Sequence, residues 1–400
     1  MRTLIRSGRV FDPASGEIAD ADIAIDGENV YQVGPGLDGD AEVDASGLTV
    51  LPGLIDTHVH VMLPYLDTVR LLETPFSMFF FLAEANLRRT LDCGITYVRD
   101  ANGADLGVAQ AVRSGLVDGP DLKITVQALS QTGGHGDYWL PSGCSLPPIP
   151  LHPGRPGGVV DGPQEVRKRV REIIRAGADF IKVNASGGVF SPRDDPRHAH
   201  FRMDELTAIV EEARAAGITV MAHAHGTEAI KNSVRAGIRS IEHGTYLDSE
   251  AVDLMSTHGT WLVPTLGVAR QIRESIEAGA RVPDAIRAKL DDGIEAHAAS
   301  FRLALEAGVR IAMGSDAAAE GHGRNLVELR LMHELGMPAP DVLRAATSSA
   351  AELMGIADRV GSIEPGKRAD LTLVAGEAYD FGGYPGNVRM VFKAGRQVRG

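Results

Sequence analysis

Histidines and one aspartate stand where short apolar stretches of the sequence end. Three stretches end in histidine: LTVLPGLIDTHVH, ITVMAHAH and IRSIEH. A fourth ends in aspartate, VRIAMGSD. Imidazole nitrogens and carboxylate oxygens that converge suit a divalent cation, with Zn²⁺ the expected ion. The residues concerned are His58, His60, His223, His225, His243 and Asp316.

His58 and His60 are two residues apart on an expected strand, so both side chains point to one face and can chelate one ion. Lys182 lies within another expected strand, ADFIKVN. An unpaired ammonium there would be costly to bury. A salt bridge to an acidic residue would solve this. Carboxylation by CO2 would also solve it, giving a carbamate that can bridge two metals, and the spacing leaves both solutions open.

The elements that must position these residues follow one recurring pattern. A helical stripe of Val166, Val170, Ile173 and Ile174 ends at a glycine, and a strand starts at once. The same join precedes ITYVRD, ITVMAH, IRSIEH, TWLVPT and VRIAMGSD. With LKITVQAL and the strand before His58 this gives eight strands, which predicts an α/β fold, a (β/α)8 TIM-like barrel. An open doubly wound sheet is the alternative. In such a barrel the carboxyl ends of the strands carry the chemistry.

The two ends of the chain differ from the middle. Residues 2–50 and 360–400 read as short strands with turns, and neither end has enough apolar residues for its own core. We expect them to form one small composite β-sandwich domain. The predicted division is 1–52 and 358–400 for this domain and 53–357 for the barrel.

Composition excludes several classes of protein. Of the 400 residues 44% are hydrophobic and 23% charged, as in an ordinary globular protein. The net charge of −13 disfavours binding to nucleic acid or an anionic membrane. Two cysteines make no disulfide framework, and the start of the chain turns polar too early for a signal peptide. We therefore expect a soluble, cytoplasmic homo-oligomer whose partner is a small-molecule or dipeptide substrate.

Several motifs together resemble the metal-dependent amidohydrolase superfamily. They are PGLIDTHVH, Lys182, His223, His243, GSD at 314–316, and the flanking segments LIRSGRVFDP and PGKRADLTLV. A closer resemblance, to the imidazolonepropionase-like, prolidase-like branch, rests on QTGGHGD, MAHAHG and IEHGTYLD. This branch includes Xaa-Pro dipeptidases, C-terminal carboxypeptidases and ochratoxin-type amide hydrolases. The resemblance covers nearly the whole chain.

The resemblance implies a binuclear metal site. His58, His60 and Asp316 would hold one ion, His223 and His243 the other, and carboxylated Lys182 would bridge both. The choice of His223 over His225 follows the family pattern, and His225 would line the site. Two such ions would generate a metal-bridging hydroxide at neutral pH.

Other polar residues are candidates for catalysis or substrate binding. Asp316 would move the proton of the attacking water to the leaving amine. His135, within TGGHGD, and Tyr246 would hydrogen-bond the carbonyl oxygen or the oxyanion. His322 and Arg324, within AEGHGRN, would bind a substrate carboxylate. A surface or loop-stabilising role is the alternative for the last four.

These features predict a metal-dependent hydrolase of peptide or N-acyl amino acid amide bonds, similar to a dipeptidase or carboxypeptidase. The second prediction is hydrolysis of another small amide, such as a lactam, a carbamate or an ochratoxin-like conjugate. From a different class, a catalytically inactive scaffold is the third.

Overall fold

Parallel strands form the part of the molecule that carries the histidines. The structure, a computed structural model, describes residues 2–65, 67–189, 194–277 and 284–400. One sheet has the strand order β6-β7-β8 and another the order β13-β12-β11-β10-β9, and all neighbours are parallel. These strands are β6 (Leu54–Val59), β7 (Ile95–Asp100), β8 (Asp121–Ile124), β9 (Ala128–Leu129), β10 (Ile181–Asn184), β11 (Val220–Ala224), β12 (Ser240–His243) and β13 (Trp261–Val263).

Two of the eight predicted strands differ from expectation. LKITVQAL is divided into β8 and β9, because Val126 between them has a φ of 64° and leaves the extended conformation. VRIAMGSD is not a regular strand. It forms single parallel bridges, Leu262↔Ile311 on one side and Val59↔Ala317 on the other. The chain turns at Asp316, whose φ of 54° is incompatible with a continuing strand.

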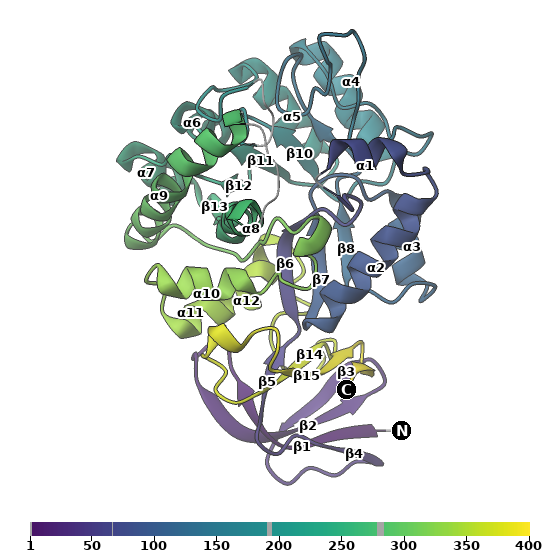
Figure 1. Cartoon of the computed structure of the whole chain (residues 1–400). Coiled ribbons are helices and arrows are strands. Elements are labelled where there is room, and N and C mark those ends of the chain that lie inside the picture. The colour runs from purple at the N-terminus through teal and green to yellow at the C-terminus, as the bar shows by residue number, and fades with distance from the viewer. Residues whose placement is uncertain (1, 66, 190–193, 278–283) are drawn as a thin grey trace.

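Helices lie between most consecutive strands, as predicted, and Figure 1 shows them around the parallel strands. In α4 (Gly162–Arg175) three members of the predicted stripe, Val166, Val170 and Ile173, are buried, whereas the fourth, Ile174, is only partly buried. Gly237 ends α6 with a φ of 89°, a conformation that favours glycine. The other helices are α1 (Thr68–Glu73), α2 (Met78–Asp92), α3 (Leu106–Arg113), α5 (Met203–Ala215), α6 (Thr227–Ala236), α7 (Ser249–His258), α8 (Leu266–Glu277), α9 (Asp284–Glu306), α10 (Val327–Glu334), α11 (Ala339–Ala345) and α12 (Ser348–Leu353).

Strands from the two ends of the chain share one eight-stranded sheet, which lies at one end of the molecule in Figure 1. The order is β16-β15-β14-β5-β1-β2-β3, with β4 paired to β1. The two ends meet where β14 runs antiparallel to β5, with Leu373 opposite Val50. The strands are β1 (Arg2–Phe11), β2 (Ile18–Asp26), β3 (Asn29–Gly34), β4 (Ala41–Asp44), β5 (Leu48–Pro52), β14 (Leu371–Ala375), β15 (Val388–Lys393) and β16 (Arg396–Arg399).

The largest apolar core extends across both regions. It contains many buried residues of the parallel strands and their helices, including Val183 and Ile241, together with end-strand residues such as Phe11 and Val391. A smaller cluster, with Ile5 and Leu371 at 0% exposure, belongs to the end strands. Among the described residues, no helix combines the length and apolar character needed to cross a bilayer.

Candidate metal centre

The first group of potential ligands brings together residues far apart in the sequence. His58 lies in β6, His60 follows that strand, and Asp316 follows the bridged segment beside it. Asp316 Oδ1 is 3.4 Å from His58 Nε2 and 3.2 Å from His60 Nε2. Ligand atoms about 2.1 Å from one Zn²⁺ in a tetrahedron lie roughly 3.4 Å apart. The spacing therefore suits one cation.

The second group is formed by three buried histidines. His223 lies in β11, His225 follows it, and His243 ends β12. Each offers a ring nitrogen, and the three nitrogens lie within 4.8 Å of one another. The ring of His225 stacks on that of His243, with centroids 4.7 Å apart. Since β11 and β12 are parallel neighbours, their carboxyl ends bring these rings to one place.

Lys182, in β10, is 3% exposed and forms no ion pair with any residue that the structure describes. Burial lowers the pKa of its ammonium to about 8, although Glu242 and Asp316 favour the charged form. Its charge also helps to lower the pKa of His58 in the first group and of His223 in the second. Lys182 is therefore within electrostatic reach of both groups, and the salt bridge that the spacing left open is not formed with any residue that the structure describes.

The protonation states suit cation binding. Burial holds the pKa of His58, His223 and His243 well below the usual value, so these rings are neutral at neutral pH and have a lone pair to offer. Burial by itself would raise the pKa of Asp316, but His58, His60 and Lys182 outweigh it and keep that pKa below the usual value. Neutral imidazoles beside a carboxylate are the donor set that Zn²⁺ accepts.

Neighbouring side chains orient the histidine rings. Thr265 Oγ1 is 2.7 Å from Nδ1 of His243, and Thr245 Oγ1 is 2.7 Å from Nδ1 of His225. Nε2 of His297, in α9, is 2.8 Å from the carbonyl oxygen of His243. Sequence reasoning gave none of these three a role in the site, because the sequence does not show which side chains the histidine rings will contact.

His135 lies beside the second group, and its role at the substrate carbonyl stays a prediction. Its ring stacks on that of His223, with centroids 4.4 Å apart, and its Nδ1 is 3.2 Å from Asp194 Oδ2. A Cβ at Gly188 would lie 2.2 Å from the His135 ring, so only glycine allows this approach. The ring is partly exposed.

The other three candidates for substrate contacts, Tyr246, His322 and Arg324, contact other protein groups in the structure. The Tyr246 hydroxyl donates to Asp292 Oδ2 at 2.8 Å, and the Arg197 guanidinium lies over its ring. His322 is 3% exposed, with its ring nitrogens 3.0 Å from Thr90 Oγ1 and 3.3 Å from the His60 carbonyl oxygen. Their roles in oxyanion and substrate binding stay predictions.

Arg324 forms an ion pair with Glu274 at 2.8 Å, and both side chains are about half exposed. Among the described residues, no contact joins this guanidinium to either histidine group. Its predicted role in carboxylate binding also stays a prediction.

Two residues that sequence reasoning missed lie directly behind His58. Glu242 Oε2 is 2.7 Å from Nδ1 of His58, and Arg99 Nη2 is 3.0 Å from Glu242 Oε1. Asp100, next to Arg99, accepts hydrogen bonds from the backbone nitrogens of Val61 and Ala104 and so fixes the turn after His60. The sequence held a signal, since charged residues in otherwise apolar strands need buried partners.

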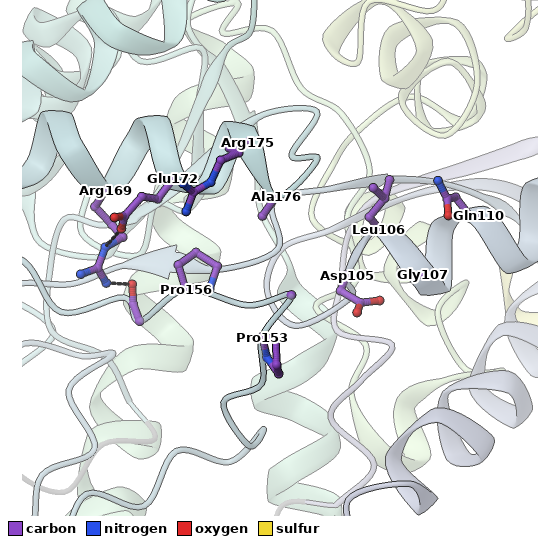
Figure 2. A pocket seen from close by; sticks show the side chains of 12 residues that line it. Asp105, Leu106, Gly107, Gln110, Pro153, Pro156, Arg169, Glu172, Arg175 and Ala176 are labelled. Atoms are coloured by element: carbon purple, nitrogen blue, oxygen red, sulfur yellow. Dashed lines mark hydrogen bonds and ion pairs between the residues drawn. The ribbon is translucent and has the colours of Figure 1, made fainter.

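A cavity of about 660 Å³ lies between α3, α4 and the loop around Pro153 (Figure 2). It is lined by none of the predicted site residues. Arg169 at its wall donates to the Gly157 carbonyl and pairs with Glu172 at 2.9 Å, so this charge is already neutralised. The cavity is not part of the candidate metal centre.

The chain is similar to several known proteins. Ochratoxinase of Aspergillus niger is 37% identical over 336 residues, covering 80% of this chain and 69% of that protein. Imidazolonepropionase of Cutibacterium acnes is 26% identical over 413 residues, covering 96% and 92%. The crystal structure of a Xaa-Pro dipeptidase with methionine bound in its active site matches with a TM-score of 0.91 and 35% identity, covering 100% of both chains.

These relatives belong to the branch that the motifs indicated. The model of the amidohydrolase family matches residues 49–398, which include both histidine groups and Lys182. The chain belongs to the amidohydrolase family, and it is a hydrolase that acts on carbon–nitrogen bonds.

Proposed function

We propose that the chain hydrolyses a peptide or N-acyl amino acid amide bond, as a dipeptidase or carboxypeptidase-like enzyme, with two divalent cations that we expect to be Zn²⁺. The observation that carries this proposal is the pair of ligand groups, His58, His60 and Asp316 in one and His223, His225 and His243 in the other. The likeness to a Xaa-Pro dipeptidase over the full length of both chains supports the substrate class.

In this proposal His58, His60 and Asp316 would hold the first cation, and His243 with His223 would hold the second. Carboxylated Lys182 would be a ligand to both. Two observations support carboxylation: the lysine has no ion pair among the described residues, and a pKa of about 8 leaves part of the amine neutral and nucleophilic. The neutral amine attacks the carbon of CO2, forms the N–C bond and loses one proton.

The choice between His223 and His225 stays a prediction. Nδ1 of His225 lies against Thr245, which leaves Nε2 available to a cation. Nε2 of His223 lies 3.1 Å from the Gly187 carbonyl oxygen. The family pattern favours His223, and single substitutions of each histidine with measured zinc content would decide.

We also propose that the parallel strands close into a (β/α)8 barrel over residues 53–357. Two backbone hydrogen bonds support closure, since Leu262 donates to Arg310 on one side and Asp316 donates to His58 on the other. Residues 1–52 and 358–400 would form the composite β-sandwich domain, supported by the sheet that they share. That the chain is a homo-oligomer stays a prediction.

The cations, when bound, would activate water at neutral pH and polarise the scissile carbonyl. Asp316, a carboxylate at neutral pH, takes the proton from the attacking water and gives it to the amide nitrogen as the C–N bond breaks. His135 would donate a hydrogen bond to the carbonyl oxygen. Tyr246 would reach that oxygen only after its hydroxyl leaves Asp292.

Hydrolysis of another small amide is the second candidate, with a lactam, a carbamate or an ochratoxin-like conjugate as substrate. The identity of 37% with ochratoxinase favours it specifically. A catalytically inactive scaffold is the least favoured function, because a protein without chemistry has no need of two complete ligand groups.

A substrate screen tests the proposal. The zinc-loaded protein is offered a library of dipeptides and N-acyl amino acids, and release of the C-terminal amino acid is measured beside metal content. We expect about two ions per chain, as a two-metal site requires, and turnover of some members. Turnover of ochratoxin-like amides alone would favour the second candidate. A protein that takes up no metal and cleaves nothing would support the scaffold.

A further inference from the structure

We propose that Glu242, held in place by Arg99 and Ser240, is a positioning residue that fixes the tautomer and the orientation of the His58 ring. In this arrangement Nδ1 of His58 carries the proton and Nε2 faces the cation site. The inference rests on the proposed function for its consequence, which is metal affinity, but the tautomer itself is measurable without metal or substrate.

The contact between Glu242 and His58 defines the tautomer. Glu242 lies in β12 and is 0% exposed, and His58 lies in β6 and is 1% exposed. Oε2 of Glu242 is 2.7 Å from Nδ1 of His58. Because a carboxylate oxygen only accepts, Nδ1 must donate. Nε2 then has a free lone pair, and it is this nitrogen that lies 3.4 Å from Asp316 Oδ1.

The second oxygen of Glu242 is equally engaged. Oε1 accepts from Arg99 Nη2 at 3.0 Å and from Ser240 Oγ at 2.5 Å. With both oxygens bound, the carboxylate cannot rotate away from His58. The direction of the imidazole is therefore set by a group that is itself fixed.

Arg99, in β7, connects this carboxylate to the backbone of β6. Its Nε donates to the Thr57 carbonyl oxygen at 2.6 Å, one residue before His58, and its Nη1 is 3.3 Å from Ser240 Oγ. Three strands thus meet at one buried ion pair. The arrangement fixes the ring of His58 and the backbone that carries it with respect to each other.

Stability alone is a poor reason for such a pair. Arg99 is 3% exposed, so both charges have lost their hydration. A buried ion pair is often no more stabilising than apolar residues of similar volume. Carboxylates that hydrogen-bond a ligand histidine do have a known physical effect, because they fix the ring and raise the basicity of the ligand nitrogen.

Glu242→Gln tests the inference with little change in shape. Gln has one accepting oxygen and one donating amide nitrogen, whereas Arg99 and His58 both require an acceptor. If the amide nitrogen faces His58, Nδ1 must accept and the proton moves to Nε2, which blocks the metal-binding nitrogen. If it faces Arg99 instead, two donors oppose each other in the protein interior.

The first measurement uses metal-free full-length protein labelled with ¹⁵N-histidine. We expect a downfield Nδ1–H resonance in the parent that is assigned to His58 by its loss in His58→Gln. Glu242→Gln should remove or shift that resonance. An unchanged resonance in Glu242→Gln would overturn the inference, whatever the protein does with metals.

The second measurement is the dissociation constant for Zn²⁺ in competition with a chelator. We expect Glu242→Gln to weaken zinc binding about 10- to 100-fold, and Ser240→Ala, which removes one hydrogen bond, to weaken it less. Asp370→Asn is the matched control, since Asp370 is a buried acid paired with Arg368 in the end-strand sheet. It should lower stability but leave zinc affinity unchanged.

Three outcomes must be distinguished. If the Glu242 and Arg99 variants lose only stability, as Asp370→Asn does, the pair is structural and the inference is wrong. If Glu242→Gln does not fold, Ser240→Ala and Arg99→Lys give the same comparison. If the parent binds no zinc, the proposed function fails, while the histidine resonance still decides the inference.

Discussion

At the scale of the residue, Asp316 shows how position sets chemistry. Its φ of 54° lies in the left-handed region, which aspartate tolerates better than most residues. This turn directs its carboxylate at the Nε2 atoms of His58 and His60. Because the two imidazoles and Lys182 keep its pKa low, the carboxylate is ready to accept a proton at neutral pH.

Asp316→Asn is expected to lower kcat/KM for any amide substrate about 10²- to 10⁴-fold, since an amide cannot take the proton of the attacking water. Turnover and zinc content should be measured together, because Asn also removes a charged ligand. Asp341→Asn, which removes a carboxylate paired with Arg344 in α11, should leave turnover unchanged. An Asp316→Asn protein with a full metal complement and parental turnover would rule out the proton-transfer role.

Residue types and spacing predicted which side chains belong to the candidate metal centre, but not which partners the other candidate residues contact. The spacing of His58 and His60 on one strand is enough to place both on one face. Nothing in AEGHGRN indicated that His322 would be buried against Thr90, or that Arg324 would pair with Glu274. These partners come from other elements, and one sequence does not record which elements meet.

At the scale of the element, periodicity was a reliable guide wherever one face of a helix packs on strands. Val166, Val170 and Ile173 of the stripe in α4 are 0% exposed, while Ile174, its fourth member, is partly exposed. Periodicity failed where the backbone itself departs from regular geometry. Val126 and Asp316 have positive φ, so one predicted strand is divided and another is reduced to single bridges.

Two neighbouring isoleucines in α4 give a direct test of this packing. Ile173→Ala removes a fully buried side chain and is expected to lower the free energy of unfolding by about 2 to 5 kcal/mol. Ile174→Ala, at the partly exposed next position, should cost clearly less. Urea denaturation followed by fluorescence measures both. Equal losses from the two variants would contradict the packing described for α4.

At the scale of the whole molecule, the ligands come from both halves of the chain. His58 and Asp316 are 258 positions apart, yet Asp316 donates its backbone hydrogen bond to the His58 carbonyl. A cation bound by both residues would therefore connect the first and last parallel segments. Metal binding should stabilise the fold as well as supply chemistry.

Removal of metal with a chelator is expected to lower the free energy of unfolding, and Zn²⁺ should restore it. At a zinc concentration 100 times the dissociation constant, one site contributes about 2.7 kcal/mol. Thermal and urea unfolding of chelated and reloaded protein measure this difference. His60→Gln should reduce the response. Identical unfolding curves with and without zinc would show that the ligand groups bind no cation.

The sequence by itself determined what depends on neighbours along the chain. It predicted the helical stripe, the strand-end histidines and the family, because periodicity and motif spacing are local properties. The tertiary structure decided what depends on distant segments. It showed that β14 pairs with β5, that Lys182 has no ion pair among the described residues, and that Arg99 and Glu242 lie behind His58. Buried charges find their partners only when the strands come together, so the contacts that tune the site are a property of the fold.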